Sequence, residues 1–353
     1  MIIVFLLIST SGFCDHAVPL ATHLKKVKIS YKSHDYNTTI TEACNALYHE
    51  RQKSTAYSYL ARAYEEMGLV IPAIASYMKY TTCCKPDNIK KARRKIEYLK
   101  KKTDEKLLKA ALANIPERVL TSEAHYKRSK VYRIKDFIYD PLGRKIEEKY
   151  CRPNGGNEYK LEYIYNSKGL LIEKNRYDDD GMLSVASTIL YKDGKEARLE
   201  SRNPSGDVVS KESYAYDLGG NLKSVMVYNK DEELVSKKSL FYNKDNLYEE
   251  TLRDYKDSYG MGNYTARNIY KEGKLVGKEI NYKAGQFEKV KYAYRGGKLK
   301  NEIYYSTEDV PVKSKKYVYN ASGDLREIGE YKIFSKRRQT LTSKVSYQYS
   351  KKH

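Results

Sequence analysis

The chain has 353 residues and is strongly basic, with 66 Lys and Arg against 45 Asp and Glu and a formal net charge of +21. This length is sufficient for two domains, or for one domain followed by a repeat array. It contains 37 Tyr but only 6 Phe and no Trp. Because Tyr suits surfaces that are buried on one side and wet on the other, the composition argues against a thick, dry core and indicates thin, repetitive β-structure.

The N-terminal residues combine a short apolar run, residues 2–8, with small and polar residues after it. This run is too short to span a bilayer, which takes about 20 residues. It predicts a secretory signal peptide over residues 1–17, although the expected Lys or Arg at its start is absent. Cys14 lies where a lipoprotein cysteine would lie, but the bulky Phe13 precedes it. Cleavage and lipidation at Cys14 stay open as alternatives, and both predict an exported protein in the periplasm, at the outer membrane or on the cell surface.

The remaining cysteines form no CxxC pair, so the sequence offers no zinc or thioredoxin-type motif. In an oxidising compartment Cys44 could pair with Cys83 or Cys84. The alternative is that these cysteines are free thiols buried in helices.

Helical periodicity extends over residues 36–113, where apolar residues recur at steps of three and four. Capping residues, Gly68 and Pro86 divide this segment. Four helices are predicted, over residues 37–52, 54–67, 71–82 and 86–107.

The second and third of these helices resemble a tetratricopeptide repeat, with Pro86 one residue late and Tyr80 where a second Ala is usual. Such repeats bind peptides along their first helices. The resemblance therefore implies a peptide-binding face, and the alternative is a helical unit that only caps the β-array. The residues at the motif spacings are Tyr57, Leu60, Ala61, Tyr64, Gly68, Ala73 and Tyr77. The residues implied for the peptide-binding face are Thr55, Ser58, Arg62 and Glu65.

Basic residues greatly outnumber acidic ones between Lys85 and Lys109. A basic amphipathic helix can bind an anionic surface, which makes Lys90, Arg93, Arg94 and Lys101 candidate polyanion contacts. The apolar stripe of the same helix is needed for packing against the preceding helix, so a solvated charged face is the competing interpretation.

From residue 126 to 350 short alternating runs are separated by turns in which a Gly recurs every 12 or 13 residues. This period leaves room for one strand and one hairpin turn, and consecutive hairpins produce an antiparallel meander. The turn glycines are Gly169, Gly181, Gly194, Gly206 and Gly219, then Gly273, Gly285 and Gly297.

Two of the turn segments, FIYDPLGRK (137–145) and YAYDLGGNL (214–222), resemble the YD repeats of Rhs and teneurin-type proteins. The resemblance implies long twisted hairpins. The toxin-enclosing function of an Rhs shell is not carried over, because the self-cleaving segment that closes such shells is missing. We therefore predict an α+β chain, in which a small tetratricopeptide-like helical domain precedes an open, curved, single-layer sheet of about 15 to 17 strands.

The sequence argues against an enzyme. The chain has 6 His, and none of them lies between residues 126 and 352. With no phosphate loop, metal-spaced cluster or nucleophile motif, we expect no catalytic residue, cofactor, metal or small-molecule substrate. Two functions remain: a protein-interaction scaffold with a protein or peptide partner, or a binder of glycans or other polyanions through the basic, Tyr-rich sheet. The oligomeric state stays open.

Overall fold

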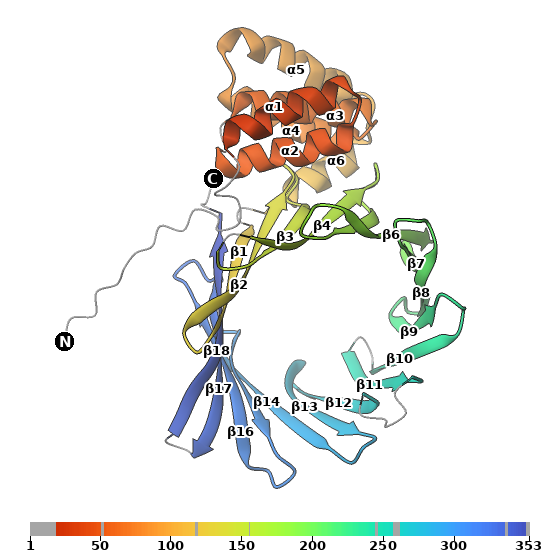
Figure 1. Cartoon of the computed structure of the whole chain (residues 1–353), viewed down its shortest axis with the longest axis vertical. Helices are drawn as coiled ribbons and strands as arrows, with labels where there is room; N and C mark the ends of the chain where they lie inside the picture. The colour runs from red at the N-terminus through yellow and green to blue at the C-terminus, as the bar shows by residue number, and fades with distance from the viewer. Residues whose placement is uncertain are drawn as a thin grey trace, which may run out of the picture. The chain divides into compact units, whose positions relative to one another are not determined.

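The residues that the structure describes fold as six helices followed by eighteen antiparallel strands, the α+β class expected from the sequence (Figure 1). The predicted signal peptide, including Cys14, lies outside the residues that the structure describes. The computed structural model describes residues 19–50, 53–116, 119–154, 156–243, 246–256, 262–335 and 338–350.

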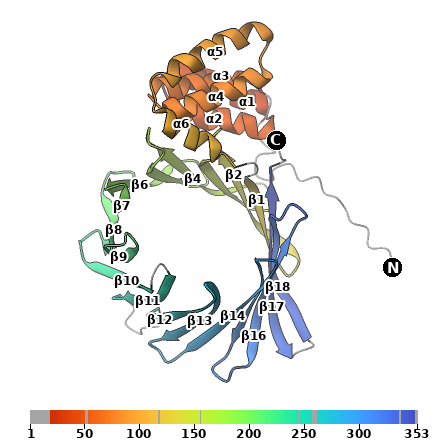
Figure 2. The same cartoon turned by 180° about the vertical axis from the view of Figure 1, so that it is seen from behind.

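The helices form an antiparallel stack in which α1 packs on α2, α2 on α3, α3 on α4 and α4 on α5 (Figures 1 and 2). The stack begins with α1, a helix that lies before residue 36 and that the sequence pattern did not predict. The expected fourth helix is two helices, since Asp104 caps a new one by accepting a hydrogen bond from the Leu107 N–H at 2.8 Å. The bounds are α1 (Leu20–Lys32), α2 (Tyr36–His49), α3 (Ser54–Glu66), α4 (Val70–Cys83), α5 (Pro86–Lys100) and α6 (Glu105–Ala113).

Local sequence explains where α2 and α3 begin and end. Asp35 caps α2 by accepting a hydrogen bond from the Thr38 N–H at 3.1 Å. Gly68 follows α3 with φ +70°, the left-handed conformation that glycine adopts without steric cost. Ser54 is the first helical residue of α3, and Lys53 holds the cap position without a side-chain hydrogen bond.

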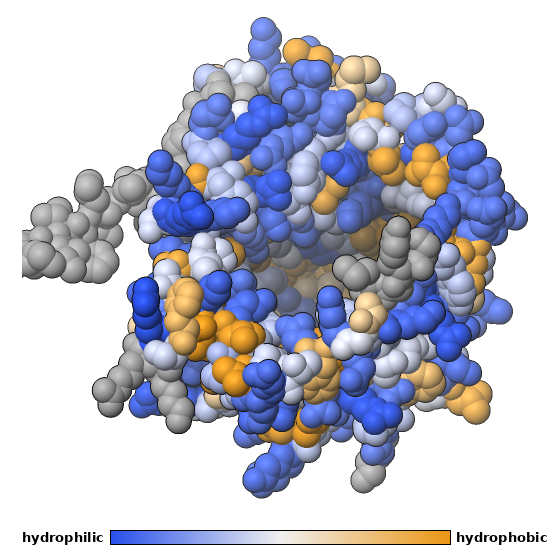
Figure 3. Space-filling model, turned by 60° about the horizontal axis from the view of Figure 1, so that its bottom comes forward, coloured by the Kyte–Doolittle hydropathy of each residue, from blue (hydrophilic) through white to orange (hydrophobic). Residues whose placement is uncertain are grey.

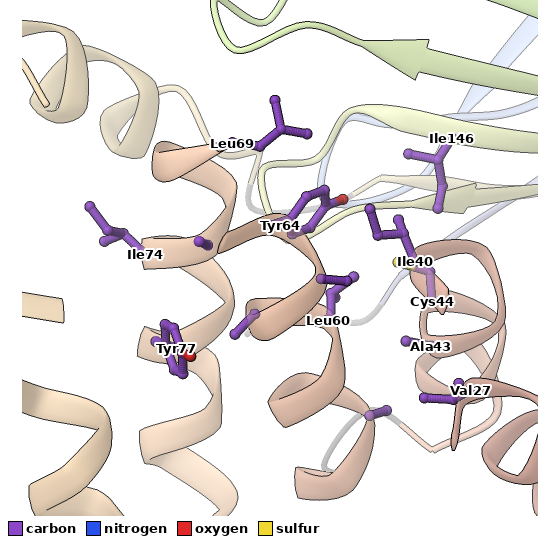
Figure 4. Close-up of a cluster of buried hydrophobic side chains, with 14 of the residues drawn as sticks. Val27, Ile40, Ala43, Cys44, Leu60, Tyr64, Leu69, Ile74, Tyr77 and Ile146 are labelled. Atoms are coloured by element: carbon purple, nitrogen blue, oxygen red, sulfur yellow. The ribbon is translucent and has the colours of Figure 1, made fainter. Parts of the chain in front are cut away.

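The helical core contains the residues at the tetratricopeptide spacings. Leu60, Ala61 and Ala73 are fully buried, and Tyr64 is nearly so. Figure 4 shows this cluster together with Ile146, which comes from the β-segment. The helices and the first hairpins therefore share one core.

The cysteines in the helices are all free. Cys44 is buried, whereas Cys83 and Cys84 are half-buried. Of the two alternatives left open by the sequence, the structure has free thiols and no disulfide between Cys44 and Cys83 or Cys84, although only Cys44 is buried. Burial raises the pKa of the Cys44 thiol well above its ordinary value, which makes this group unreactive.

The described residues of the β-segment form eighteen strands, one more than the upper end of the expected 15 to 17. A turn at Arg128 and Ser129 contains no glycine, although both residues have positive φ. The strands are β1 (Leu120–Lys127), β2 (Lys130–Tyr139), β3 (Lys145–Cys151), β4 (Asn157–Tyr165), β5 (Leu171–Tyr177), β6 (Leu183–Lys192), β7 (Lys195–Arg202), β8 (Val208–Tyr216), β9 (Leu222–Asn229), β10 (Leu234–Asn243), β11 (Asn246–Asp254), β12 (Tyr264–Lys271), β13 (Lys274–Tyr282), β14 (Phe287–Arg295), β15 (Lys298–Tyr305), β16 (Pro311–Tyr319), β17 (Leu325–Ser335) and β18 (Arg338–Tyr349).

The strand order corrects the expected open sheet. Consecutive strands pair in a meander, and β1 pairs with both β2 and β18, so the sheet closes as a barrel. At the chain's end the Ser350 N–H donates to the Val119 carbonyl at 2.9 Å, and the Thr121 hydroxyl donates to the Gln348 carbonyl at 3.2 Å. Closure satisfies the backbone groups that an open sheet leaves unpaired along its edges.

Two kinds of turn connect the strands. In the five-residue kind, Asp217 accepts a hydrogen bond from the Gly220 N–H at 3.0 Å and donates its own N–H to the Asn221 carbonyl. The glycine with positive φ is Gly220 (+85°) and not the expected Gly219. In the two-residue kind, Asp193 and Gly194 both have positive φ, which identifies a type I′ hairpin.

Tyr–Glu hydrogen bonds recur along the sheet. Glu148 accepts from Tyr150 at 2.5 Å and from Tyr163 at 3.0 Å. Glu302 accepts in the same way from Tyr304 at 2.6 Å and from Tyr317 at 2.5 Å. The same spacing in two separate parts of the chain shows that the hairpins are structural repeats.

Hydrophilic side chains cover most of the face in Figure 3, where hydrophobic residues form only small patches.

The chain forms two compact units. The first contains the helices, β3, β4 and β5, most of β2, and the chain from Gln348 onward; the second contains residues 124–132 and 183–347. The first unit therefore joins the helical segment to hairpins that directly follow it.

The five-residue turn at residues 140–144 lies in the first unit, with Asp140 buried and the other four residues half-buried. Asp140 accepts hydrogen bonds from the Leu142 and Arg144 N–H groups, both at 2.9 Å, and from Arg144 Nε at 2.7 Å. The second guanidinium nitrogen of Arg144 lies 2.6 Å from the Asp140 carboxylate, whose side chain is 0% exposed. Nearby, Lys149 Nζ donates to Asn45 Oδ1 on α2 at 3.0 Å. The ion pair thus fixes the turn internally, and the Lys149–Asn45 hydrogen bond connects β3 to α2.

A carboxylate in the second unit makes the stability of the sheet dependent on pH. Glu250 is paired with Lys278 at 2.8 Å and with Lys238 at 2.9 Å. Burial alone would raise the pKa of Glu250, but hydrogen bonds from the two Lys hold it below its ordinary value. A carboxyl group with a lowered folded-state pKa stabilises the fold above its unfolded pKa and loses this contribution as pH falls through the folded pKa.

We therefore expect Glu250→Gln to cost about 1 to 3 kcal/mol at pH 7. The difference from wild type should shrink below about pH 4, as the wild-type carboxyl becomes protonated. Urea unfolding between pH 7 and pH 3 measures this difference. Glu308→Gln, in an exposed turn, is the control and should change little at any pH. A constant difference across the whole pH range would contradict the prediction.

Candidate binding surface of the helical unit

The four residues expected to bind a peptide lie on α3 at spacings of three and four, so they share one face of that helix. Arg62 is exposed, whereas Thr55, Ser58 and Glu65 are half-buried. The structure therefore brings the four together along one helix but gives them different environments.

Arg62 is held in place by aromatic rings. Its guanidinium carbon lies 4.4 Å from the ring centre of Tyr31 on α1 and 5.6 Å from that of Tyr59. The two rings contact each other edge to face, with their centres 5.4 Å apart. A guanidinium stacked on aromatic rings keeps its in-plane N–H groups directed to the side, where they can bind carboxylates or carbonyl groups. Tyr31 was missed because it belongs to α1, whose apolar periodicity is weak.

Glu65 serves mainly to connect helices. It accepts hydrogen bonds from the Tyr77 hydroxyl on α4 at 3.0 Å and from Lys95 Nζ on α5 at 2.6 Å. Burial, together with the charge of Glu65, raises the pKa of Tyr77. Of the four residues, Arg62 is thus the one that is exposed.

The candidate polyanion contacts Lys90, Arg93 and Arg94 on α5 and Lys101 directly after it are all exposed and border the same shallow depression. The opposite side of α5 buries Ala92, Ile96 and Leu99 against the stack. Both sequence interpretations of this helix are thus compatible with its structure, because the apolar stripe packs while the charges remain solvated.

The exposed Tyr98 continues this basic surface. Its side chain is 50% exposed, and Lys102 Nζ lies 4.3 Å from the ring centre. An exposed aromatic ring beside cations offers both stacking and charge to a ligand.

Within the described parts of the chain, no group of three or more His, Cys, Asp or Glu side chains could hold a metal ion. None of the helices there combines the length and hydropathy needed to cross a bilayer.

No family model and no curated protein matches the chain. Several solved structures are similar at low identity. A porin-like protein from Bacteroides uniformis is 10% identical with a TM-score of 0.37, covering 67% of this chain and 97% of that one. A porin-like protein from Bacteroides vulgatus is 14% identical with a TM-score of 0.27, covering 65% and 98%. The Photorhabdus luminescens Tc holotoxin pore is 12% identical with a TM-score of 0.26, covering 59% and 14%. TM-scores this low support no functional argument.

Proposed function

We propose that this chain is an exported, non-enzymatic repeat protein that acts as a protein–protein interaction scaffold in the bacterial cell envelope or on its surface. The observation that carries the proposal is the exposed Arg62, which is oriented by Tyr31 and Tyr59 in the middle of a helical stack. Protein interfaces are enriched in Arg and Tyr, and the contacts of Arg62 with the Tyr31 and Tyr59 rings restrict the Arg62 side chain before a partner binds.

We further propose that α3 and α4 form a tetratricopeptide-like repeat and that the hairpins are YD-like repeats. Burial of Leu60, Ala61 and Ala73 supports the first assignment, because small residues let paired helices approach closely. The five-residue turns at Asp140 and Asp217 support the second, since both follow a Tyr and share the same hydrogen bonds. Both repeat types expose much surface for the core they bury, as scaffolds do.

A second candidate function is the binding of glycans or other polyanions. It is favoured by the four exposed cations that α5 gathers along one surface, Lys90, Arg93, Arg94 and Lys101. Binding of this kind would weaken steeply with added salt.

Site-specific crosslinking in the native host tests the scaffold proposal. A photoreactive amino acid at position 58 on α3 should give a discrete protein adduct after irradiation. The same amino acid at Lys283, an exposed turn residue of the sheet, is the matched control and should not give that adduct. Fractionation of the same cells should place the chain outside the cytoplasm. Absence of any protein adduct from α3 would refute the scaffold proposal.

A further inference from the structure

A groove on the helical stack combines an apolar floor with a basic rim. It is formed by α4, α5 and α6, of which α4 contacts both of the others. Its volume is about 750 Å³, within the range of sites that bind side chains of a ligand. Apolar side chains from all three helices form its floor, namely Met78, Ile96, Leu108 and Leu112.

The rim of the groove keeps a positive charge after its internal ion pairs are counted. Glu97 is paired with Lys100 at 2.8 Å, and Glu105 is paired with Lys109 at 2.7 Å. The other two charged side chains of the rim are Arg93 and Lys101. Neither forms an ion pair with another residue of the described chain. The groove therefore presents uncompensated cations beside exposed apolar surface.

Apolar surface of this kind indicates a binding surface rather than a solvated helix face. The Met78 side chain is 42% exposed although it lies beside the buried Ile96 and Leu108. A flexible thioether at the edge of a groove adapts to varied apolar partners. An amphipathic helix that inserts apolar residues at steps of three and four fits a groove lined by helices.

We infer that this groove binds an acidic amphipathic helix of a partner protein, an inference that rests on the proposed scaffold function and specifies the partner's chemistry. The apolar stripe of the partner covers the exposed Met78 and the half-buried Leu112. Carboxylates flanking that stripe pair with Arg93 and Lys101. Both complementary features are required, because a polyanion alone leaves the floor exposed and an apolar helix alone leaves the cations unpaired.

The test uses the full chain and a fluorescein-labelled synthetic peptide of 18 residues, with Leu at steps of three and four and Glu at the other positions. Its affinity is measured by fluorescence anisotropy at physiological salt. The double variant Arg93→Glu/Lys101→Glu should weaken binding by about tenfold or more. Met78→Asp, on a side chain already partly exposed, should also weaken it.

The matched control is Lys90→Glu/Arg94→Glu, which makes the same change in net charge on the same helix but outside the groove. It should leave the affinity within about twofold, since it removes only longer-range attraction. Equal loss in the two double variants would overturn the inference in favour of general polyanion binding. Equal binding of a peptide with the same composition in scrambled order would also overturn it.

Two further outcomes separate this inference from the proposed function. Self-association that Met78→Asp abolishes, without peptide binding, would assign the groove to a second copy of the chain and overturn the inference. Absence of peptide binding alongside a protein adduct from position 58 would refute the inference alone. Peptide binding without any adduct in the host would refute the scaffold proposal instead.

Discussion

Asp140→Ala is expected to destabilise the first unit by about 3 to 5 kcal/mol. The substitution removes the carboxylate that Arg144 contacts at 2.7 and 2.6 Å and leaves a largely buried guanidinium without its partner. It also removes the acceptor of the Leu142 and Arg144 N–H groups. Urea unfolding followed by far-UV circular dichroism at the helical wavelength measures the loss.

The same substitution in another turn provides the control. Asp217 accepts from the Asn221 N–H at 2.8 Å in an equivalent five-residue turn. The carboxylate of Asp217 takes part in no ion pair with a described residue. Asp217→Ala should therefore destabilise the fold far less than Asp140→Ala, because the Asp217 carboxylate is accessible to water and the groups that bond to it can bond to water instead. Equal effects of the two variants would contradict the role assigned to the buried ion pair.

Gly143→Ala is expected to destabilise the first unit by several kcal/mol, on the order of 3 or more, because it combines backbone strain with a steric clash. Gly143 has φ +76°, and an added Cβ would lie 2.4 Å from Pro116 Cδ. Pro116 belongs to the connection between α6 and β1, so relief of the clash requires that this connection move away from the turn. The change in urea midpoint for the helical transition measures the effect.

Gly194 provides a control with the same backbone conformation. It also has φ +76°, but an added Cβ would meet nothing within 4 Å. Gly194→Ala should therefore show the strain of positive φ alone, about 1 kcal/mol. If the two glycine variants were equally destabilised, the contact between Pro116 and the turn would not contribute to the fold.

The sequence predicted local features well, because hydrophobic spacing and turn chemistry determine them. The tetratricopeptide spacing identified Leu60 and Ala73 as core residues, and both are fully buried. Glycine spacing located most turns, although it selected Gly219 in a turn where Gly220 is the glycine with positive φ. The helix α1 was missed because its buried residues include His23 and Ser30, which break the apolar pattern.

Features that depend on distant residues were not predictable from local patterns. Closure of the sheet joins Val119 to Ser350, which are 231 residues apart, and no local pattern encodes such a pairing. The position of Arg62 could be assigned to a helix face, but the rings that orient it come partly from the unforeseen α1. Glu65 was assigned to ligand binding, whereas its bonds to Tyr77 and Lys95 use it to join helices.

The central claim is that the helical stack binds a protein partner through Arg62. The crosslinking experiment in the native host tests this claim most directly when it is repeated with the charge of Arg62 reversed. The photoreactive group stays at position 58, and Arg62→Glu is compared with Arg267→Glu, an exposed Arg of the sheet paired with Glu249. We expect the protein adduct to disappear in Arg62→Glu and to persist in Arg267→Glu. An adduct that is equally strong in both variants would contradict the claim.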